Sequence, residues 1–164
     1  DGCSGCHMSF LDMDERLLEL AQHADLVYSP LVDVKEYPED VDVCLVEGAV
    51  STTDDWAKIR TVRARTKTLV SFGDCAVTAN VPSLRNPIGA QPLLDRAYVE
   101  NVDLNPGIPV RVVPALTDRS VGVHKAVPVD VFLPGCPPPA DVIYETLLRL
   151  LGVAAPPGRP LRFG

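Results

Sequence analysis

The stretch that decides the fold is Thr68-Leu69-Val70-Ser71-Phe72-Gly73-Asp74-Cys75, an apolar strand that stops at a glycine and runs into a cysteine. A similar order recurs at Val129–Leu133, which is followed by Pro134-Gly135-Cys136, and at Val41–Val46, which runs into Glu47-Gly48. In open α/β sheets the functional loops follow the carboxyl ends of the strands. We therefore expect these three loops to meet at one edge of a sheet.

Strand and helix patterns alternate over the rest of the chain, as they do in α/β proteins. The pattern predicts a flavodoxin-like α/β fold, which is an open, mostly parallel sheet with helices on both faces and the marked loops at its carboxyl edge. Further strands are expected at Leu26–Tyr28 and Val110–Val113, and helices after an N-cap at Asp12, from Thr52 to about Thr66, near Pro92–Val99 and from Ala140 to about Leu151.

The composition fits one globular domain that spans residues 1–164. Of the 164 residues, 46% are hydrophobic, which is enough for one sizeable core. The net charge of −7 argues against nucleic-acid binding, because phosphate contacts need clustered Lys and Arg. We find no apolar run near the roughly 18 residues of a membrane span, and no signal peptide.

The sequence also leads to one prediction about each end of the chain. A cysteine loop that precedes a helix usually follows a strand, so we expect residues upstream of Asp1 to be missing from this sequence. The proline-rich stretch 154–164 is expected to form an extended tail.

Four of the five cysteines lie in loops marked by glycine, as the pair in Cys3-Ser4-Gly5-Cys6 and as the single Cys75 and Cys136. A close pair and two distant thiols, gathered by folding, can form the four-thiolate site of an iron–sulfur cubane. The fifth, Cys44, lies in an apolar run and is expected in the core. An odd number of thiols favours a reducing, cytoplasmic location over a secreted disulfide framework.

Spacing alone leaves two other chemistries open. Four thiolates can hold a structural zinc ion, although such sites more often use two close pairs or a pair with histidines. A C-x-x-C before a helix is also the redox motif of thioredoxin-like proteins, but the two single cysteines would then have no task. A zinc-stabilised interaction protein is therefore the alternative to an electron carrier, and metal content distinguishes the two.

The motifs resemble those of [NiFe]-hydrogenase small subunits and occur in the same order. The segments that resemble the family's four motifs are Cys3–Asp12, Val46-Glu47-Gly48, Gly73-Asp74-Cys75-Ala76 and Leu133-Pro134-Gly135-Cys136-Pro137-Pro138. His7–Glu15 and Val127–Leu133 are most similar to the bidirectional, NAD-reducing branch. The chain has no cysteine after Cys136, so it resembles the short form with one cluster. The related quinone-reductase subunit of complex I usually has two adjacent cysteines in its first motif, which disfavours that interpretation.

This resemblance implies that Cys3, Cys6, Cys75 and Cys136 bind one [4Fe–4S] cluster, and that the chain relays electrons without a catalytic residue of its own. The nickel–iron centre would lie on a hydrogenase large subunit. Diaphorase subunits with FMN and further clusters would exchange electrons with NAD, for a net H2 + NAD+ = NADH + H+. A short small subunit with another acceptor is the alternative. We expect no FMN on this chain, because the cysteine pair occupies the first loop, where a flavodoxin-like fold would hold phosphate.

Four further residues are expected beside the cluster or at an interface with the large subunit, namely Gly5, His7, Glu47 and Gly135. The two glycines would let backbone N–H groups approach the sulfur atoms, or they are ordinary turn residues. Glu47 would pass protons or fix the partner, or form a plain salt bridge. His7 would donate to the large subunit or pack on the surface. His23 and His124 are expected to serve structure or to face solvent rather than to bind metal, and Trp56 is expected in the core or at an interface.

Overall fold

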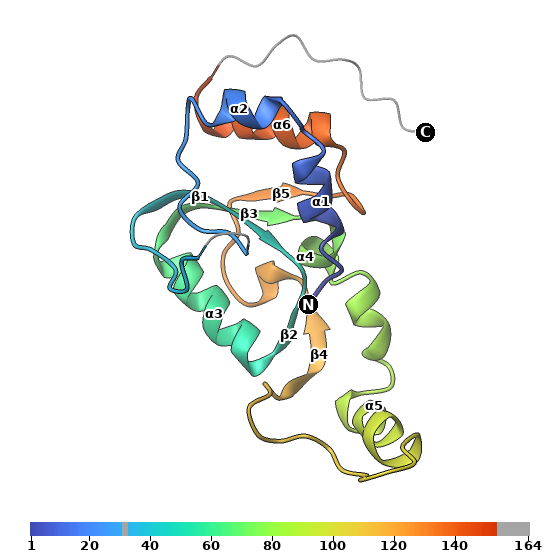
Figure 1. Cartoon of the computed structure of the whole chain (residues 1–164). Helices are drawn as coiled ribbons and strands as arrows, with labels where there is room; N and C mark the ends of the chain where they lie inside the picture. Colours follow the sequence, from blue (N-terminus) through green and yellow to red (C-terminus); the bar gives the residue numbers. More distant parts are fainter. Residues whose placement is uncertain (31–32, 154–164) are drawn as a thin grey trace.

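The computed structural model describes residues 1–30 and 33–153, so the expected tail at 154–164 lies outside the described residues. The centre of the molecule is a parallel sheet with the strand order β1-β3-β5 (Figure 1). Its strands are β1 (Val41–Glu47), β3 (Thr66–Phe72) and β5 (Val131–Leu133). Leu69 and Val70 of the middle strand are fully buried, as expected for a parallel strand covered on both faces.

Helices cover both faces of this sheet and enclose two apolar cores (Figure 1). One face carries α1 (Gly5–Leu11), α2 (Arg16–Leu20) and α6 (Ala140–Leu150), whose residues surround Val70 and Phe72. The other face carries α3 (Thr53–Ala64), whose buried residues pack with Leu69. The predicted α/β sheet with helices on both faces is confirmed.

The remaining elements are a second pair of strands and several short helices, and Val50, Ala76 and Val123 from them join the core around Leu69. Two strands, β2 (Val50–Thr52) and β4 (Leu116–Val121), form an antiparallel pair that the sequence analysis did not predict. The short helices are α4 (Asp74–Thr78), η1 (Val81–Arg85), α5 (Ala90–Asp95), η2 (Arg96–Glu100) and η3 (Val123–Lys125). No helix within the described ranges is both long and apolar enough to cross a lipid bilayer.

Several predicted elements agree with the structure and have clear local causes. Thr52 is the N-cap of α3, where its side chain accepts from the backbone N–H of Asp55 and Asp55 accepts from the Thr52 N–H, a complete capping box. The helix ends at Ala64, slightly earlier than expected, because Thr66 already begins β3. The helix expected near Pro92–Val99 corresponds to α5 and η2.

Three predicted elements are wrong. Asp12 does not begin a helix; it follows the last residue of α1, and its backbone N–H bonds to the Met8 carbonyl at 2.9 Å. Val110–Val113 is not a strand, since these residues are exposed and Val112 has a φ of 65°. Leu26–Tyr28 is irregular, because no described strand lies beside it to complete a ladder.

Candidate cofactor site at the carboxyl edge of the sheet

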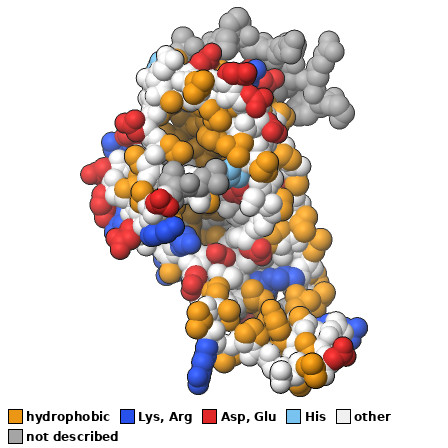
Figure 2. All heavy atoms as spheres, viewed as in Figure 1, with side chains coloured by type: hydrophobic (Ala, Val, Ile, Leu, Met, Phe, Trp, Pro, Cys, Tyr) orange, Lys and Arg blue, Asp and Glu red, His pale blue; other side chains and the backbone are white. Residues whose placement is uncertain are grey.

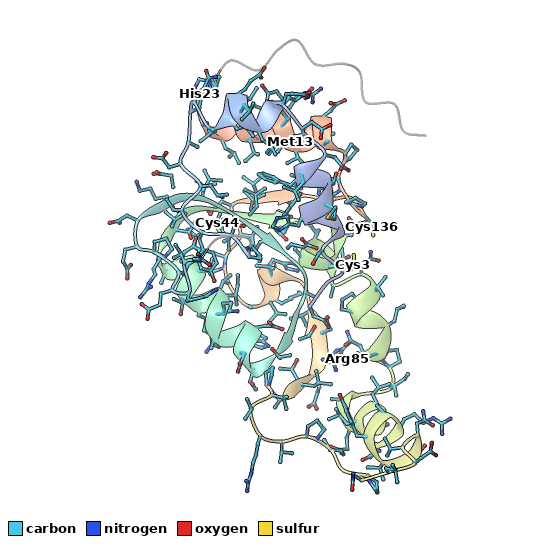
Figure 3. The ribbon with its side chains drawn as sticks, viewed as in Figure 1. Cys3, Met13, His23, Cys44, Arg85 and Cys136 are labelled. Atoms are coloured by element: carbon cyan, nitrogen blue, oxygen red, sulfur yellow. The ribbon has the colours of Figure 1, made fainter. Side chains whose placement is uncertain are left out.

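The four glycine-marked cysteines come from three places at one edge of the parallel sheet. Cys3 lies just before α1 and Cys6 in its first turn, Cys75 lies in α4 directly after β3, and Cys136 follows β5. Figure 3 shows Cys3 and Cys136 on the same side of the molecule, away from Cys44. The parallel strands thus deliver residues far apart in the sequence to one place.

Backbone hydrogen bonds hold the Cys75 and Cys136 loops together. The Gly73 N–H donates to the Leu133 carbonyl at 2.8 Å, which extends the β3–β5 ladder by one step. The Asp74 N–H donates to the Gly135 carbonyl at 2.8 Å, and the Gly135 N–H donates to Asp74 Oδ1 at 2.7 Å. Asp74 was not predicted as a site residue, although it stands inside the Gly73-Asp74-Cys75 motif.

Glycine is required at Gly73 by both conformation and space. Its φ of 83° lies in the region that favours glycine, and a Cβ built there would lie 2.1 Å from Cys6 Sγ. Gly135, with a φ of 140°, would place a Cβ 2.5 Å from Pro138 Cα. A Cβ on Gly5 would lie 3.2 Å from Cys3 Sγ. These glycines let backbone and sulfur atoms approach one another closely.

The four thiols influence one another electrostatically. Burial, the Glu47 carboxylate and the three other cysteines raise the pKa of Cys6 to about 12. Burial, followed by Cys136 and Cys3, also raises the pKa of Cys75. Without a metal ion, Cys6 and Cys75 are therefore held as protonated thiols, and metal binding has to displace their protons.

In the part of the chain that the structure describes, no three His, Cys, Asp or Glu side chains lie close enough together to hold one metal ion. In a cubane, each thiolate binds a different iron atom, so its sulfurs lie further apart than the ligands of one ion. Cys6 is buried and Cys75 half-buried, whereas Cys3 and Cys136 are exposed.

Two hydrogen bonds fix α1, which carries Cys6, to the rest of the site. Glu47 Oε2 accepts from the backbone N–H of His7 at 3.0 Å, which ties the helix to the end of β1. The buried Ser9 hydroxyl donates to the Pro138 carbonyl at 2.6 Å, which ties the same helix to the Cys136 loop. Ser9 was not predicted, because its partner is 129 residues away in the sequence.

The structure gives other neighbours to the remaining singled-out residues. Cys44 is half-buried in β1 beside the second core, and burial raises its pKa. Trp56 packs partly buried against the same core, with Arg60 over its ring. The His124 ring meets Phe132 edge-on, and Figure 3 places His23 at the far end of the molecule.

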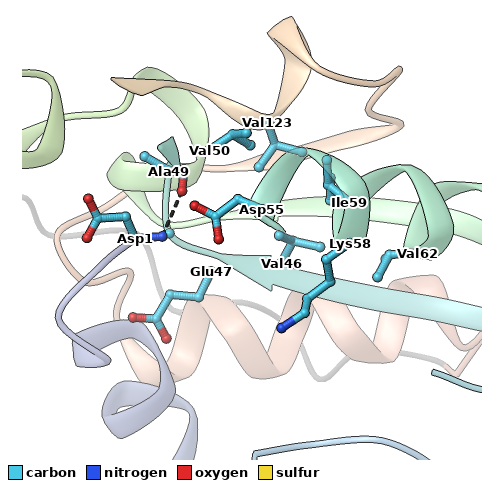
Figure 4. A pocket seen from close by; sticks show the side chains of 11 residues that line it. Asp1, Val46, Glu47, Ala49, Val50, Asp55, Lys58, Ile59, Val62 and Val123 are labelled. Atoms are coloured by element: carbon cyan, nitrogen blue, oxygen red, sulfur yellow. Dashed lines mark hydrogen bonds between the residues drawn. The ribbon is translucent and has the colours of Figure 1, made fainter. Parts of the chain in front are cut away.

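Two cavities lie beside β1. The smaller, of about 120 Å³, is lined by Asp1, Glu47, Asp55, Lys58 and the apolar side chains around them (Figure 4). The larger, of about 550 Å³, extends along the outer edge of β1. Neither contains any of the four glycine-marked cysteines in its lining.

Comparison with known proteins places these features in context. The family model described as NADH ubiquinone oxidoreductase, 20 Kd subunit, matches residues 3–150. The NAD-reducing hydrogenase HoxS subunit delta of Cupriavidus necator is 38% identical over 164 residues, which cover 97% of this chain and 76% of that protein. A subunit of the F420-non-reducing hydrogenase vhu of Methanocaldococcus jannaschii is 36% identical, over 94% of this chain but 54% of that protein.

A solved hydrogenase structure is also similar to this chain over nearly its whole length. One chain in the crystal structure of an NAD+-reducing [NiFe]-hydrogenase in the H2-reduced state superposes on this chain with a TM-score of 0.89 and 38% sequence identity. The match covers 99% of this chain and 94% of that chain.

Proposed function

Because this chain belongs to the NADH ubiquinone oxidoreductase, 20 Kd subunit, family and is homologous to hydrogenase subunits, we propose that it is the electron-transfer small subunit of an NAD-reducing [NiFe]-hydrogenase. In this proposal Cys3, Cys6, Cys75 and Cys136 hold a single [4Fe–4S] cluster. The net reaction is H2 + NAD+ = NADH + H+, and it is reversible.

The observation that carries the proposal is the convergence of four thiols from three distant segments at the carboxyl edge of the sheet. Four thiolates are the ligand set of an iron–sulfur cubane. The raised pKa of Cys6 favours the protonated thiol unless a metal ion takes the place of the proton. When bound, a cluster of this kind accepts and releases one electron at a time.

This chain's own residues hold and shield the thiols. Gly73 leaves room for the Cys6 sulfur, and Asp74 joins the loops of Cys75 and Cys136. Asn80 Nδ2 donates to Cys136 Sγ at 3.5 Å. Hydrogen bonds to the thiolate sulfurs are among the features that set the reduction potential of such a cluster.

In this proposal the other steps of the reaction take place on partner chains. A hydrogenase large subunit would carry the nickel–iron centre, and diaphorase subunits with FMN and further clusters would exchange electrons with NAD in the cytoplasm. The two proteins at 38% identity, both described as NAD-reducing, support this acceptor. Gly5, His7, Glu47 and Gly135 would lie beside the cluster or contact the large subunit.

One relative supports an electron acceptor other than NAD. The M. jannaschii hydrogenase subunit is almost as similar in sequence as the C. necator subunit, and its name describes an F420-non-reducing enzyme. The acceptor site would lie on other chains in either case. A hydrogenase with the same small-subunit chemistry and a different acceptor module is therefore the second candidate.

Purification of the native complex through a tag on this chain would test the function. We expect the complex to contain iron and nickel and to reduce NAD with H2. Hydrogen-dependent reduction of an artificial dye without NAD reduction would favour the second acceptor. A colourless chain that contains zinc instead of iron would contradict both candidates.

A further inference from the structure

The turn between α4 and η1 has an unusual backbone. Ala79 ends α4 in the left-handed region with a φ of 67°, although it carries a side chain and is buried. Asn80 follows with a φ of 22° and a ψ of −119°, a combination that residues other than glycine rarely adopt. Strained backbone of this kind persists only where its surroundings hold it, and it is most common at functional sites. The strain therefore points to a residue that has to be held in one place.

Hydrogen bonds fix the backbone of Asn80 on both sides. The Ala79 N–H donates to the Cys75 carbonyl at 2.9 Å, and the Asn80 N–H donates to Thr78 Oγ1 at 3.4 Å. The Asn80 carbonyl accepts from the Ser83 hydroxyl at 2.7 Å and from the Ser83 N–H at 3.1 Å. These contacts join Asn80 to the helix that carries Cys75 and to η1, so its side chain leaves the turn in a fixed direction.

The side chain of Asn80 points at a sulfur atom of the candidate site. Its Nδ2 donates to Cys136 Sγ at 3.5 Å, across 56 positions of the sequence. The next residue of the turn faces another thiol. Burial is the largest of the effects that raise the pKa of Cys75, and a hydrogen bond from the Val81 backbone N–H opposes it. One strained turn thus presents two N–H donors to two of the four thiols.

The turn lies in a hydrophobic part of the surface. Val81, Leu84 and Ile88 are exposed, and Figure 2 shows hydrophobic side chains gathered over η1 and α5. Cys136 is exposed as well. A partner chain that covers this surface, as the proposed function requires, excludes water from Cys136 and leaves Asn80 as a donor to its sulfur. A hydrogen bond is electrostatically stronger in such a low-dielectric place than in water.

We propose that Asn80 raises the reduction potential of the [4Fe–4S] cluster by donating a hydrogen bond to the thiolate of Cys136. This inference rests on the proposed function, because it needs a cluster on the four thiols. Reduction adds one electron, so the negative charge on the sulfur ligands rises. The amide N–H therefore stabilises the reduced form more than the oxidised form, and the potential becomes less negative.

A purely structural role is the competing explanation, since asparagine tolerates a positive φ better than most residues. Asn105 allows the two roles to be separated. It also has a positive φ, of 53°, and it lies exposed in the irregular segment between η2 and β4. Glycine at either position suits the backbone and removes the amide. Only the change at Asn80 removes a donor to a site sulfur.

Three variants of the intact complex test the proposal in a redox titration followed by EPR. We expect Asn80→Gly to keep the cluster and to shift its one-electron equilibrium about tenfold toward the oxidised form, which lowers the potential by about 59 mV. Asn80→Asp removes the donor and adds a negative charge, so its potential should fall further. Asn105→Gly is the control and should leave the potential unchanged. An unchanged or higher potential in Asn80→Gly, or an equal shift in Asn105→Gly, would overturn the proposal.

A second readout does not depend on the variants. The complex is produced with asparagine that carries ¹⁵N only in its side-chain amide, and pulsed EPR of the reduced cluster is searched for a ¹⁵N coupling. This measurement decides the matter even if both Asn80 variants lose their cluster, since a coupling supports the proposal and its absence overturns it. An unaltered complex without iron would instead contradict the proposed function, and this proposal with it.

Discussion

Asp74 and Gly135 exchange two hydrogen bonds across the candidate site, one from the Asp74 N–H to the Gly135 carbonyl at 2.8 Å and one from the Gly135 N–H to Asp74 Oδ1 at 2.7 Å. Each residue is the immediate neighbour of a site cysteine, Cys75 in one case and Cys136 in the other. The pair therefore fixes the relative positions of two thiols that lie far apart in the sequence.

Asp74→Ala should loosen the site, whereas Asp74→Asn should largely preserve it. The alanine leaves the Gly135 N–H without its acceptor, a loss of about 1–3 kcal/mol if the group stays shielded from water. The asparagine keeps a carbonyl oxygen in place. Iron content per chain and the free energy of unfolding would be measured for both variants. Equal iron loss in the two would show that the charge of Asp74, rather than its hydrogen bond, matters.

Single replacements of the cysteines should separate ligands from a core thiol. We expect serine at position 3, 6, 75 or 136 to lower the iron content and abolish H2-driven NAD reduction, because each replacement removes one thiolate of the proposed set. Cys44→Ser is the matched control, since Cys44 lies in β1 outside the site. Iron analysis of the five variants decides the matter, and loss of iron in Cys44→Ser alone would refute the assignment.

Gly73→Ala should displace the Cys6 sulfur. The new methyl group would lie 2.1 Å from Cys6 Sγ, on a backbone with a φ of 83° that alanine rarely adopts. We expect loss of most of the iron from the purified complex. Gly107→Ala is the control, because a Cβ at Gly107 meets no atom within 4 Å. Full iron content in Gly73→Ala would mean that Cys6 does not take this position in the loaded protein.

The metal-free chain should become less stable as the pH rises above about 9. The pKa of Cys6 is raised from 9.0 to about 12 in the folded state, chiefly by burial. Between these values the unfolded chain loses the Cys6 proton and the folded chain keeps it, so the unfolding free energy falls as the pH rises. Denaturant unfolding of the metal-free chain at several pH values measures this slope. Cys6→Ser should make the slope shallower without removing it, because the pKa values of Cys44 and Cys75 are raised as well. An unchanged slope in that variant would assign the effect to these other groups.

The parts of the fold that sequence could predict are those with strong local signals. β3 is an apolar run closed by Gly73, and α3 has a capping box at Thr52 and Asp55. β4 gave no such signal, because polar residues fill its centre and its partner β2 is distant in the sequence. Asp12 and Glu15 match the pattern of a helix N-terminus, which is why a helix start was predicted there. The buried residues Cys6, Ser9 and Met13 are three and four positions apart, which is the spacing of a helix that begins before Asp12.

In the candidate site too, the residues with a local sequence signal could be predicted and the others could not. The four cysteines could be identified because glycine-marked loops carry them, two of these loops directly after apolar strands. The residues that hold the loops could not, because Asp74 and Ser9 act on partners that only folding brings near. Glu47 was singled out in the sequence, and the structure shows its carboxylate on the His7 backbone. Its role toward the cluster or the partner stays a prediction.

The central claim is that this chain relays electrons and does not itself split hydrogen. The most direct test compares two activities of a complex that carries Cys136→Ser and retains its nickel. H2-driven NAD reduction depends on the relay, whereas exchange of hydrogen isotopes with water would be confined to the large subunit. The account predicts that NAD reduction is lost while isotope exchange persists; equal loss of both activities would contradict it.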